Sequence, residues 1–160
     1  FAVYNVVCFL VAFLIPPIAA ATSRKTVHFI CLALGGLGLI SAYFAHDKYF
    51  LWVGMAGVGI AWASILSMPY VILAGAIKPS RMGVYMGVFN LFIVIPQIVM
   101  SLIIPQIYNN ILGKDPLYVV VLGGIVMLIA AVSVLLVKDV GARSIETSIP
   151  SASAVAGEEL

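Results

Sequence analysis

The polar side chains best placed to bind a ligand in this sequence are two amides and a hydroxyl that share one face of a predicted helix. Asn90, Gln97 and Ser101 stand at positions i, i+7 and i+11. At 100° per residue, Gln97 and Ser101 fall within about 20° of Asn90. Such groups hydrogen-bond to a neutral polyhydroxyl solute. The alternative is a hydrogen bond to a neighbouring helix, worth about 0.6 kcal/mol on average inside a membrane. The residues alone leave both interpretations open.

A second polar set lies in the preceding hydrophobic segment. Trp62, Ser67 and Tyr70 add an indole, a hydroxyl and a phenol. An aromatic ring stacks on the apolar face of a sugar-like ring, and its polar atom is free to hydrogen-bond. For Ser64, in the same segment, a contact between helices is the favoured interpretation. The predicted solute-binding positions are therefore Trp62, Ser67, Tyr70, Asn90, Gln97 and Ser101.

The sequence contains no arrangement of residues typical of an enzyme or a metal site. It has no HExxH motif, no Ser–His–Asp set and no pair of carboxylates within one segment. His28 and His46 are isolated and have no Cys, Asp or Glu at metal-ligand spacing. We interpret Cys8 and Cys31, which lie within hydrophobic segments, as packing residues without a disulfide. We expect no enzymatic activity, no metal, no cofactor and no nucleic-acid partner.

The segments that must position these residues are long, uncharged and apolar. Hydrophobic residues make up 64% of the chain and charged residues 9%. A transmembrane helix needs about 20 predominantly apolar residues. Since backbone groups in lipid must be paired within their own segment, the spans should be helical. We predict an all-α membrane protein whose bundle covers residues 1–137, with spans at about 1–22, 26–45, 50–77, 84–107 and 117–137. The polar tail at 138–160 is predicted to be disordered.

Two of the predicted helices carry a face of small residues, and we expect each face to pack closely against another helix. Small side chains let helix backbones approach one another in lipid. The third segment has Gly54, Gly57, Ala61 and Ser64 along one face, and the second has a glycine cluster at 35, 36 and 38. These glycines favour helix packing over any phosphate-binding role, because the chain has no Gly-x-x-x-x-Gly-Lys motif.

The basic residues predict how the chain is oriented. Alternate connections and the tail hold six of them: Arg24, Lys25, Lys78, Arg81, Lys138 and Arg143. The intervening connections hold Lys48 and Lys114. Basic residues concentrate on the cytoplasmic side of membrane proteins. We therefore expect a multi-pass protein of the cell (inner or plasma) membrane, with its C-terminus in the cytoplasm.

Three stretches carry a resemblance to a known family. The sequences GIAWASILSMPY at 59–70, RMGVYMGVFN at 81–90 and IPQ at 95–97 resemble the C-terminal half of major facilitator superfamily sugar transporters. The closer resemblance is to sucrose- and maltose-type sugar–proton symporters, related to the glycoside–pentoside–hexuronide:cation symporters. The loop after the first segment departs from the superfamily, because only Arg24 and Lys25 match its Gly-x-x-x-Asp-Arg-x-Gly-Arg-Lys signature.

The resemblance implies a function and a set of partners. The five spans would be the eighth to twelfth helices of a twelve-helix fold, and the chain would be a C-terminal fragment of a secondary active transporter. Its partners would be a sugar, a coupling cation, in the first instance a proton, the lipid bilayer and the missing N-terminal half. The alternatives are a non-transporting membrane scaffold and a major-facilitator transporter of another small solute.

Overall fold

The protein is helical throughout the part of the chain that its computed structural model describes, residues 2–137. Two 3₁₀ turns, η1 (Ala42–Phe44) and η2 (Pro79–Arg81), accompany five long helices: α1 (Ala2–Ala21), α2 (Arg24–Ser41), α3 (Lys48–Ala76), α4 (Met82–Asn110) and α5 (Pro116–Leu135). No strand occurs between residues 2 and 137. The predicted all-α class is therefore confirmed, whereas the predicted disorder of 138–160 lies outside the described residues.

All five helices are long and apolar enough to cross a membrane. This is compatible with a multi-pass membrane protein, as the composition predicted. The predicted second span, 26–45, differs most from its helix, because the α-helix ends at Ser41 and a 3₁₀ turn follows. Inside α4 the helix continues through both Pro96 and Pro105.

Two carboxylates fix the starts of helices. The Asp47 side chain accepts hydrogen bonds from the backbone N–H groups of Tyr49 (2.7 Å) and Phe50 (2.9 Å) at the start of α3. The Asp115 side chain accepts one from Leu117 (2.9 Å) at the start of α5. Such caps satisfy N–H groups that have no partner within the helix. Residues 2–137 contain no other Asp or Glu, so every carboxylate of the described region is a helix cap.

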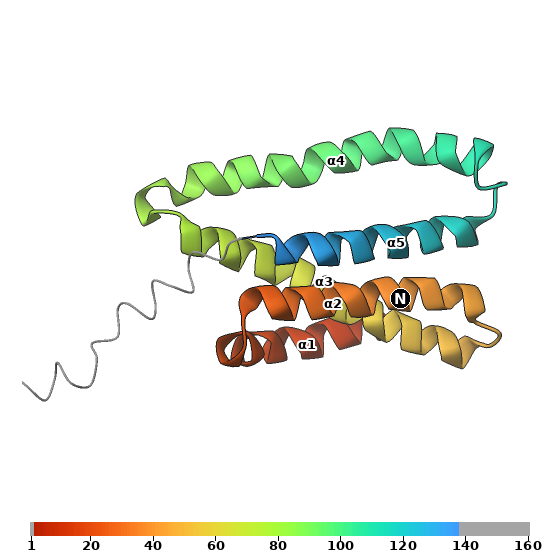
Figure 1. The fold of residues 1–160 in the computed structure, drawn as a ribbon, viewed down its shortest axis with the longest axis horizontal. Coiled ribbons are helices and arrows are strands. Elements are labelled where there is room, and N and C mark those ends of the chain that lie inside the picture. Colours follow the sequence, from red (N-terminus) through yellow and green to blue (C-terminus); the bar gives the residue numbers. More distant parts are fainter. Residues whose placement is uncertain (1, 138–160) are drawn as a thin grey trace, which may run out of the picture.

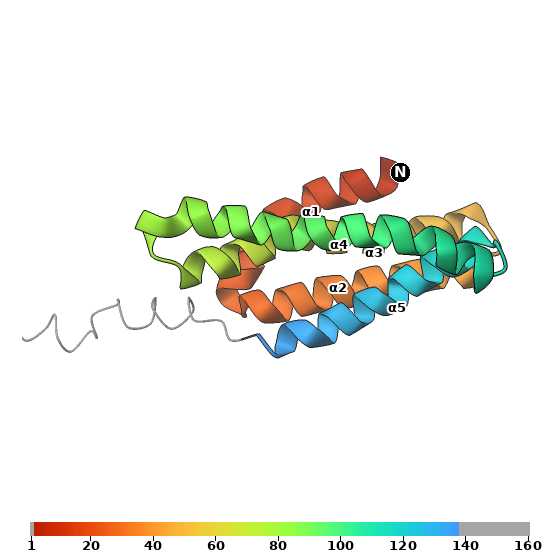
Figure 2. The same cartoon turned by 90° about the horizontal axis from the view of Figure 1, so that it is seen from above.

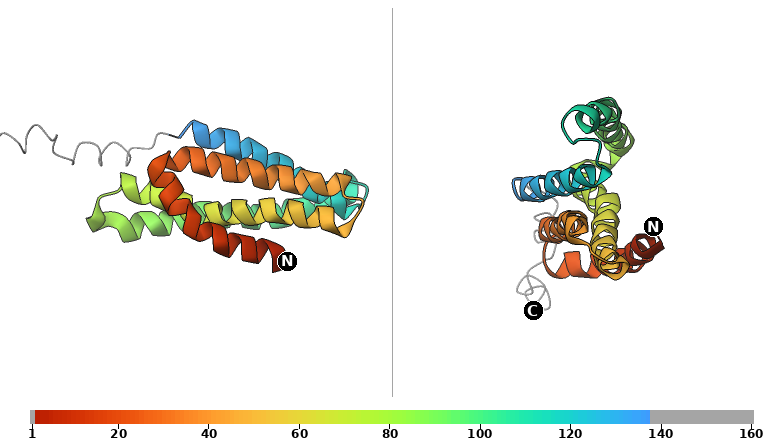
Figure 3. Two further views of the ribbon diagram at one scale, coloured as in Figure 1. Left: turned by 90° about the horizontal axis from the view of Figure 1, so that it is seen from below. Right: turned by 90° about the vertical axis from the view of Figure 1, so that its right-hand side faces the viewer.

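The helix α2 is the centre of a closely packed group. It lies against α3 on one side and α5 on the other, and α1 packs on α3 (Figure 2; Figure 3). Glycines permit the contact between α2 and α3. A Cβ atom added at Gly38 would stand 2.5 Å from the carbonyl oxygen of Gly54, and one at Gly57 would stand 2.6 Å from that of Leu34. The predicted use of both small-residue faces for close helix packing is thus confirmed, and the structure identifies α2 and α3 as partners.

A second glycine contact joins α2 to α5. A Cβ atom at Gly36 would lie 2.9 Å from the carbonyl oxygen of Gly124, and one at Gly124 would lie 2.7 Å from that of Gly36. Gly124 was not among the predicted packing residues. In the sequence it is one glycine of a nearly continuous apolar run, and its partner could not be identified without the fold.

By contrast, α4 stands apart from this group. It joins α3 and α5 through its two end connections, and for most of its length it runs separately from them (Figure 1). Not one residue of α4 is buried. We define α1, α2, α3 and α5 as the packed group, in contrast to α4.

The two ends of the molecule differ in charge. The α1–α2 and α3–α4 connections lie at one end, together with the end of α5 (Figure 1). Among residues 2–137 this end carries four basic side chains and no carboxylate: Arg24, Lys25, Lys78 and Arg81. At the opposite end, Lys48 and Lys114 are balanced by Asp47 and Asp115.

One of the four cations ties two helices together. The Lys25 ammonium, near the start of α2, donates to the carbonyl oxygens of Leu135 (3.0 Å) and Val137 (2.6 Å) at the end of α5. These carbonyls have no partners within the helix, and a cation is favourable at the negative end of a helix dipole. Lys25 therefore fastens the end of α5 to α2.

Candidate solute-binding site

The structure brings together two of the six predicted solute-binding residues. The Tyr70 hydroxyl, in the last third of α3, donates a hydrogen bond of 3.0 Å to the Asn90 side-chain oxygen on α4. The Tyr70 ring also meets the Phe89 ring edge to face, with centroids 5.1 Å apart. Among the described residues, Tyr70 and Asn90 are the only members of the predicted set that hydrogen-bond to each other. This pair therefore connects α4 to the packed group.

Further along α4 the predicted polar face is open. Gln97 and Ser101 are both exposed. The Ser101 hydroxyl donates to the carbonyl oxygen of Ile98, three residues back in the same helix, at 2.7 Å. Gln97 has no hydrogen bond to any residue within 2–137. An amide that is open on an otherwise apolar helix needs a partner or water in a membrane, so this face points to something outside the described residues.

The proline beside Gln97 adds a backbone acceptor to the same region. Pro96 has no N–H group, so the carbonyl of Phe92, four residues earlier, lacks its usual partner in the helix. The helix nevertheless continues to Asn110. Around Gln97 the backbone is thus locally weakened without being broken.

The remaining two predicted residues lie on α3. Trp62 is 45% exposed, on the outer surface of the helix. The Ser67 hydroxyl is partly buried and donates to the carbonyl oxygen of Ala63 at 2.8 Å, within its own helix. Neither is hydrogen-bonded to the Asn90 side chain. Within residues 2–137 the predicted set therefore forms one contact, Tyr70 with Asn90, flanked by separate polar positions.

A buried polar cluster inside the packed group was not predicted. The Nδ1 atom of His28 on α2 lies 2.7 Å from the hydroxyl oxygen of Ser64 on α3. Both are buried, with Ser64 at 0% exposure, and Cys31, three residues after His28 on α2, is buried as well. The sequence analysis did not predict a hydrogen-bond partner for His28, because that partner comes from another helix. The available signal was His28 and Cys31 at i and i+3, facing the small-residue stripe that includes Ser64.

This cluster differs chemically from the open face of α4. Its polar atoms are paired with one another, as buried polar groups must be to offset their loss of water. We assign it the role of holding α2 to α3. No group of three or more His, Cys, Asp or Glu residues that could hold a metal occurs among the described residues.

Comparisons with known proteins add no assignment. No family model, curated protein or solved structure matches this chain.

Proposed function

We propose that the chain is part of a secondary active transporter that moves a sugar, a disaccharide or related glycoside, across the membrane by alternating access. The observation that carries this proposal is the polar face of α4. It presents Asn90, Gln97 and Ser101; all three are exposed, and among the described helices only α3 contacts this face, through the hydrogen bond from Tyr70 to Asn90. The family resemblance of 81–90 and 95–97, which include two of these residues, points in the same direction.

The chemistry of this face suits a neutral solute. Amides donate and accept hydrogen bonds, as sugar hydroxyls do, and none of the three side chains is charged. The phenol of Tyr70 lies beside Asn90 and adds an aromatic surface. No Lys, Arg, Asp or Glu occurs between residues 82 and 113, so the face offers no counter-ion for a charged substrate.

The difference between α4 and the packed group suggests how transport proceeds. Sites in secondary transporters lie near the midplane, between bundles that rock against each other. Here α1, α2, α3 and α5 would move as one body, and α4 would form the wall of the cavity. Another helical bundle would supply the opposite wall. Coupling to protons requires an ionisable group at the site, and both described carboxylates cap helices, so the coupling acid would come from that other bundle.

Sugar uptake by cells expressing the complete protein tests the proposal. The double variant Asn90→Leu with Gln97→Leu removes both amides and should lower uptake more than about tenfold, because hydroxyls of the bound sugar lose their partners. Its matched control is Phe92→Leu with Val99→Leu, on the opposite face of α4, which should leave uptake within about twofold. Equal amounts of both variants in the membrane are required. Unchanged uptake in the amide variant would remove Asn90 and Gln97 from the site.

A second candidate function is a membrane assembly protein that uses α4 to bind another helix permanently. The observation that favours it is the exposed apolar surface of α4, where Val84, Phe92 and Leu102 are each at least 70% exposed. The two functions differ at the amide face. A transporter keeps it in contact with water and solute, whereas an assembly protein seals it against a partner.

A further inference from the structure

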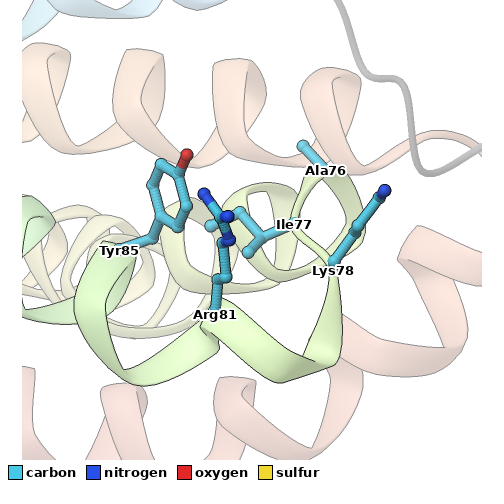
Figure 4. A pocket seen from close by; sticks show the side chains of 5 residues that line it. All are labelled: Ala76, Ile77, Lys78, Arg81 and Tyr85. Carbon is cyan, nitrogen blue, oxygen red and sulfur yellow. The ribbon is translucent and has the colours of Figure 1, made fainter.

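A cavity of about 480 Å³ lies where α3 turns into α4, away from the polar face described above. It is lined by Ala76, Ile77, Lys78, Arg81 and Tyr85 (Figure 4). The side chains of Lys78, Arg81 and Tyr85 all extend toward the same side of the ribbon (Figure 4). All three polar groups are hydrogen-bond donors, and the two cations are donors only.

Within residues 2–137 the charge around this cavity is positive and has no compensating carboxylate. Lys78 and Arg81 form no ion pair with any residue in 2–137, and no carboxylate of that range lies at this end of the molecule. The neighbouring Lys25 uses its ammonium on carbonyl oxygens of α5. Within residues 2–137, an anion bound here would therefore meet two cations that have no carboxylate partner.

The start of α4 strengthens this preference. No side chain caps the helix, and its first turn contains no acidic residue. The backbone N–H of Met82 donates to the carbonyl oxygen of Pro79, and no side chain accepts from the N–H groups that follow. The positive end of the helix dipole favours an anion at this position. The cavity and its three donor side chains define the site, and the start of α4 adds to the positive electrostatic potential there.

The shape of the donors selects the kind of anion. A planar guanidinium matches the oxygens of a phosphate in a two-pronged arrangement, and an ammonium adds a point charge. Ala76 and Ile77 line the cavity with apolar atoms, and Val84, nearby on α4, is 72% exposed. A phosphate attached to acyl chains satisfies both features, because its head group meets the cations while its chains lie along the apolar helix surface.

We propose that the α3–α4 cavity binds the phosphate of an anionic phospholipid, with Arg81 and Lys78 holding the phosphate oxygens and Tyr85 donating to one of them. The site is independent of sugar transport. Loss of lipid binding would leave the proposed function untouched, and a failed uptake test would leave this site untouched.

The test uses the complete protein purified in dodecylmaltoside and titrated with phosphatidylglycerol, with bound lipid counted by native mass spectrometry. The Lys78→Gln, Arg81→Gln double variant should weaken the first lipid-binding event about 30-fold, since each cation near a lipid phosphate contributes about fivefold. Tyr85→Phe keeps both charges and should weaken binding about threefold. The matched control, Lys48→Gln with Lys114→Gln, removes two cations at the opposite end and should leave this event unchanged.

Two further titrations separate the possible sources of the phosphate. Phosphatidylcholine should bind equally to all variants, and inorganic phosphate at millimolar concentration should not displace phosphatidylglycerol. Equal loss of phosphatidylglycerol in the control variant would overturn the site, because any two cations would then suffice. Displacement by inorganic phosphate would overturn the assignment to a lipid. Circular dichroism of each variant confirms that its helices are intact.

Discussion

The packed group and α4 are similarly apolar, yet their small and polar side chains have different surroundings. Most glycines of the packed group lie against the backbone of another helix, as Gly38 lies against Gly54, whereas Gly83 and Gly87 of α4 have nothing within 4 Å. Polar groups inside the packed group are paired, as His28 is with Ser64, whereas Gln97 of α4 is open. Composition therefore does not distinguish a closely packed helix from one that is exposed. What distinguishes them is whether the small and polar residues meet matching residues on another helix.

The largest expected difference between the two regions concerns glycine. Gly54→Leu should destabilise the protein by about 3 kcal/mol, because its side chain would enter the backbone of α2 and force the helices apart. A Cβ atom alone would already lie 2.7 Å from the Gly38 carbonyl oxygen. Gly87→Leu should instead stabilise by about 0.5 kcal/mol, since the site is open and leucine favours a helix.

Unfolding of both glycine variants in detergent, followed by circular dichroism, measures this difference. Equal stabilities would contradict the close contact between α2 and α3. A strong loss in the Gly87 variant would show that α4 is covered in the folded protein.

The next effect concerns the serine hydroxyls. Ser64→Ala should cost about 2 kcal/mol, because it leaves the buried ring of His28 without its hydrogen-bond partner. Ser101→Ala, on the open face of α4, removes only a bond to a carbonyl of its own helix and should change stability by less than about 0.5 kcal/mol. Denaturant midpoints of the two variants measure the change in stability. A smaller loss of stability in Ser64→Ala than in Ser101→Ala would contradict the structural role of Ser64.

The smallest expected effect is at the edge of the packed group. Lys25→Gln should destabilise the end of α5 by about 1 kcal/mol, because the carbonyl oxygens of Leu135 and Val137 lose their cation. Amide hydrogen exchange in the last turn of α5 should accelerate, while exchange in the middle of α2 stays the same. Arg24→Gln, one residue away and without a hydrogen bond to the end of α5, is the control. Equally fast exchange in both variants would show that the loss of positive charge, and not the loss of the Lys25 hydrogen bonds, destabilises the end of α5.

The sequence was sufficient for the helices and for part of their packing. Uncharged runs of about 20 residues have few structural options in lipid, so five helices could be predicted from length alone. The stripe that contains Gly54 and Gly57 likewise predicted close contact, because small residues at helical spacing leave room for a neighbour. Both predictions depend on properties local to one segment.

Pairings between segments could not be predicted. Gly124 gains its role only from Gly36 on another helix, and Ser64 only from His28, 36 residues away in the chain. Within the predicted solute-binding set, spacing placed Asn90, Gln97 and Ser101 on one face of α4 but could not show that Tyr70 would join Asn90. The open state of that face is a property of the fold, since it depends on where α4 lies.

The most direct test of the central claim is the water accessibility of the α4 face. Cys8→Ala and Cys31→Ser remove the native thiols, and single cysteines are introduced in the complete protein at Asn90, Gln97, Ser101 and, on the opposite face, Val99. Whole cells are treated with a membrane-impermeant thiol reagent, with and without sucrose or maltose. If this face lines a solute cavity, the reagent labels the first three positions, sugar protects them, and Val99 is not labelled. No labelling at Asn90, Gln97 and Ser101 would contradict this cavity-lining role and identify α4 as a helix sealed against a partner.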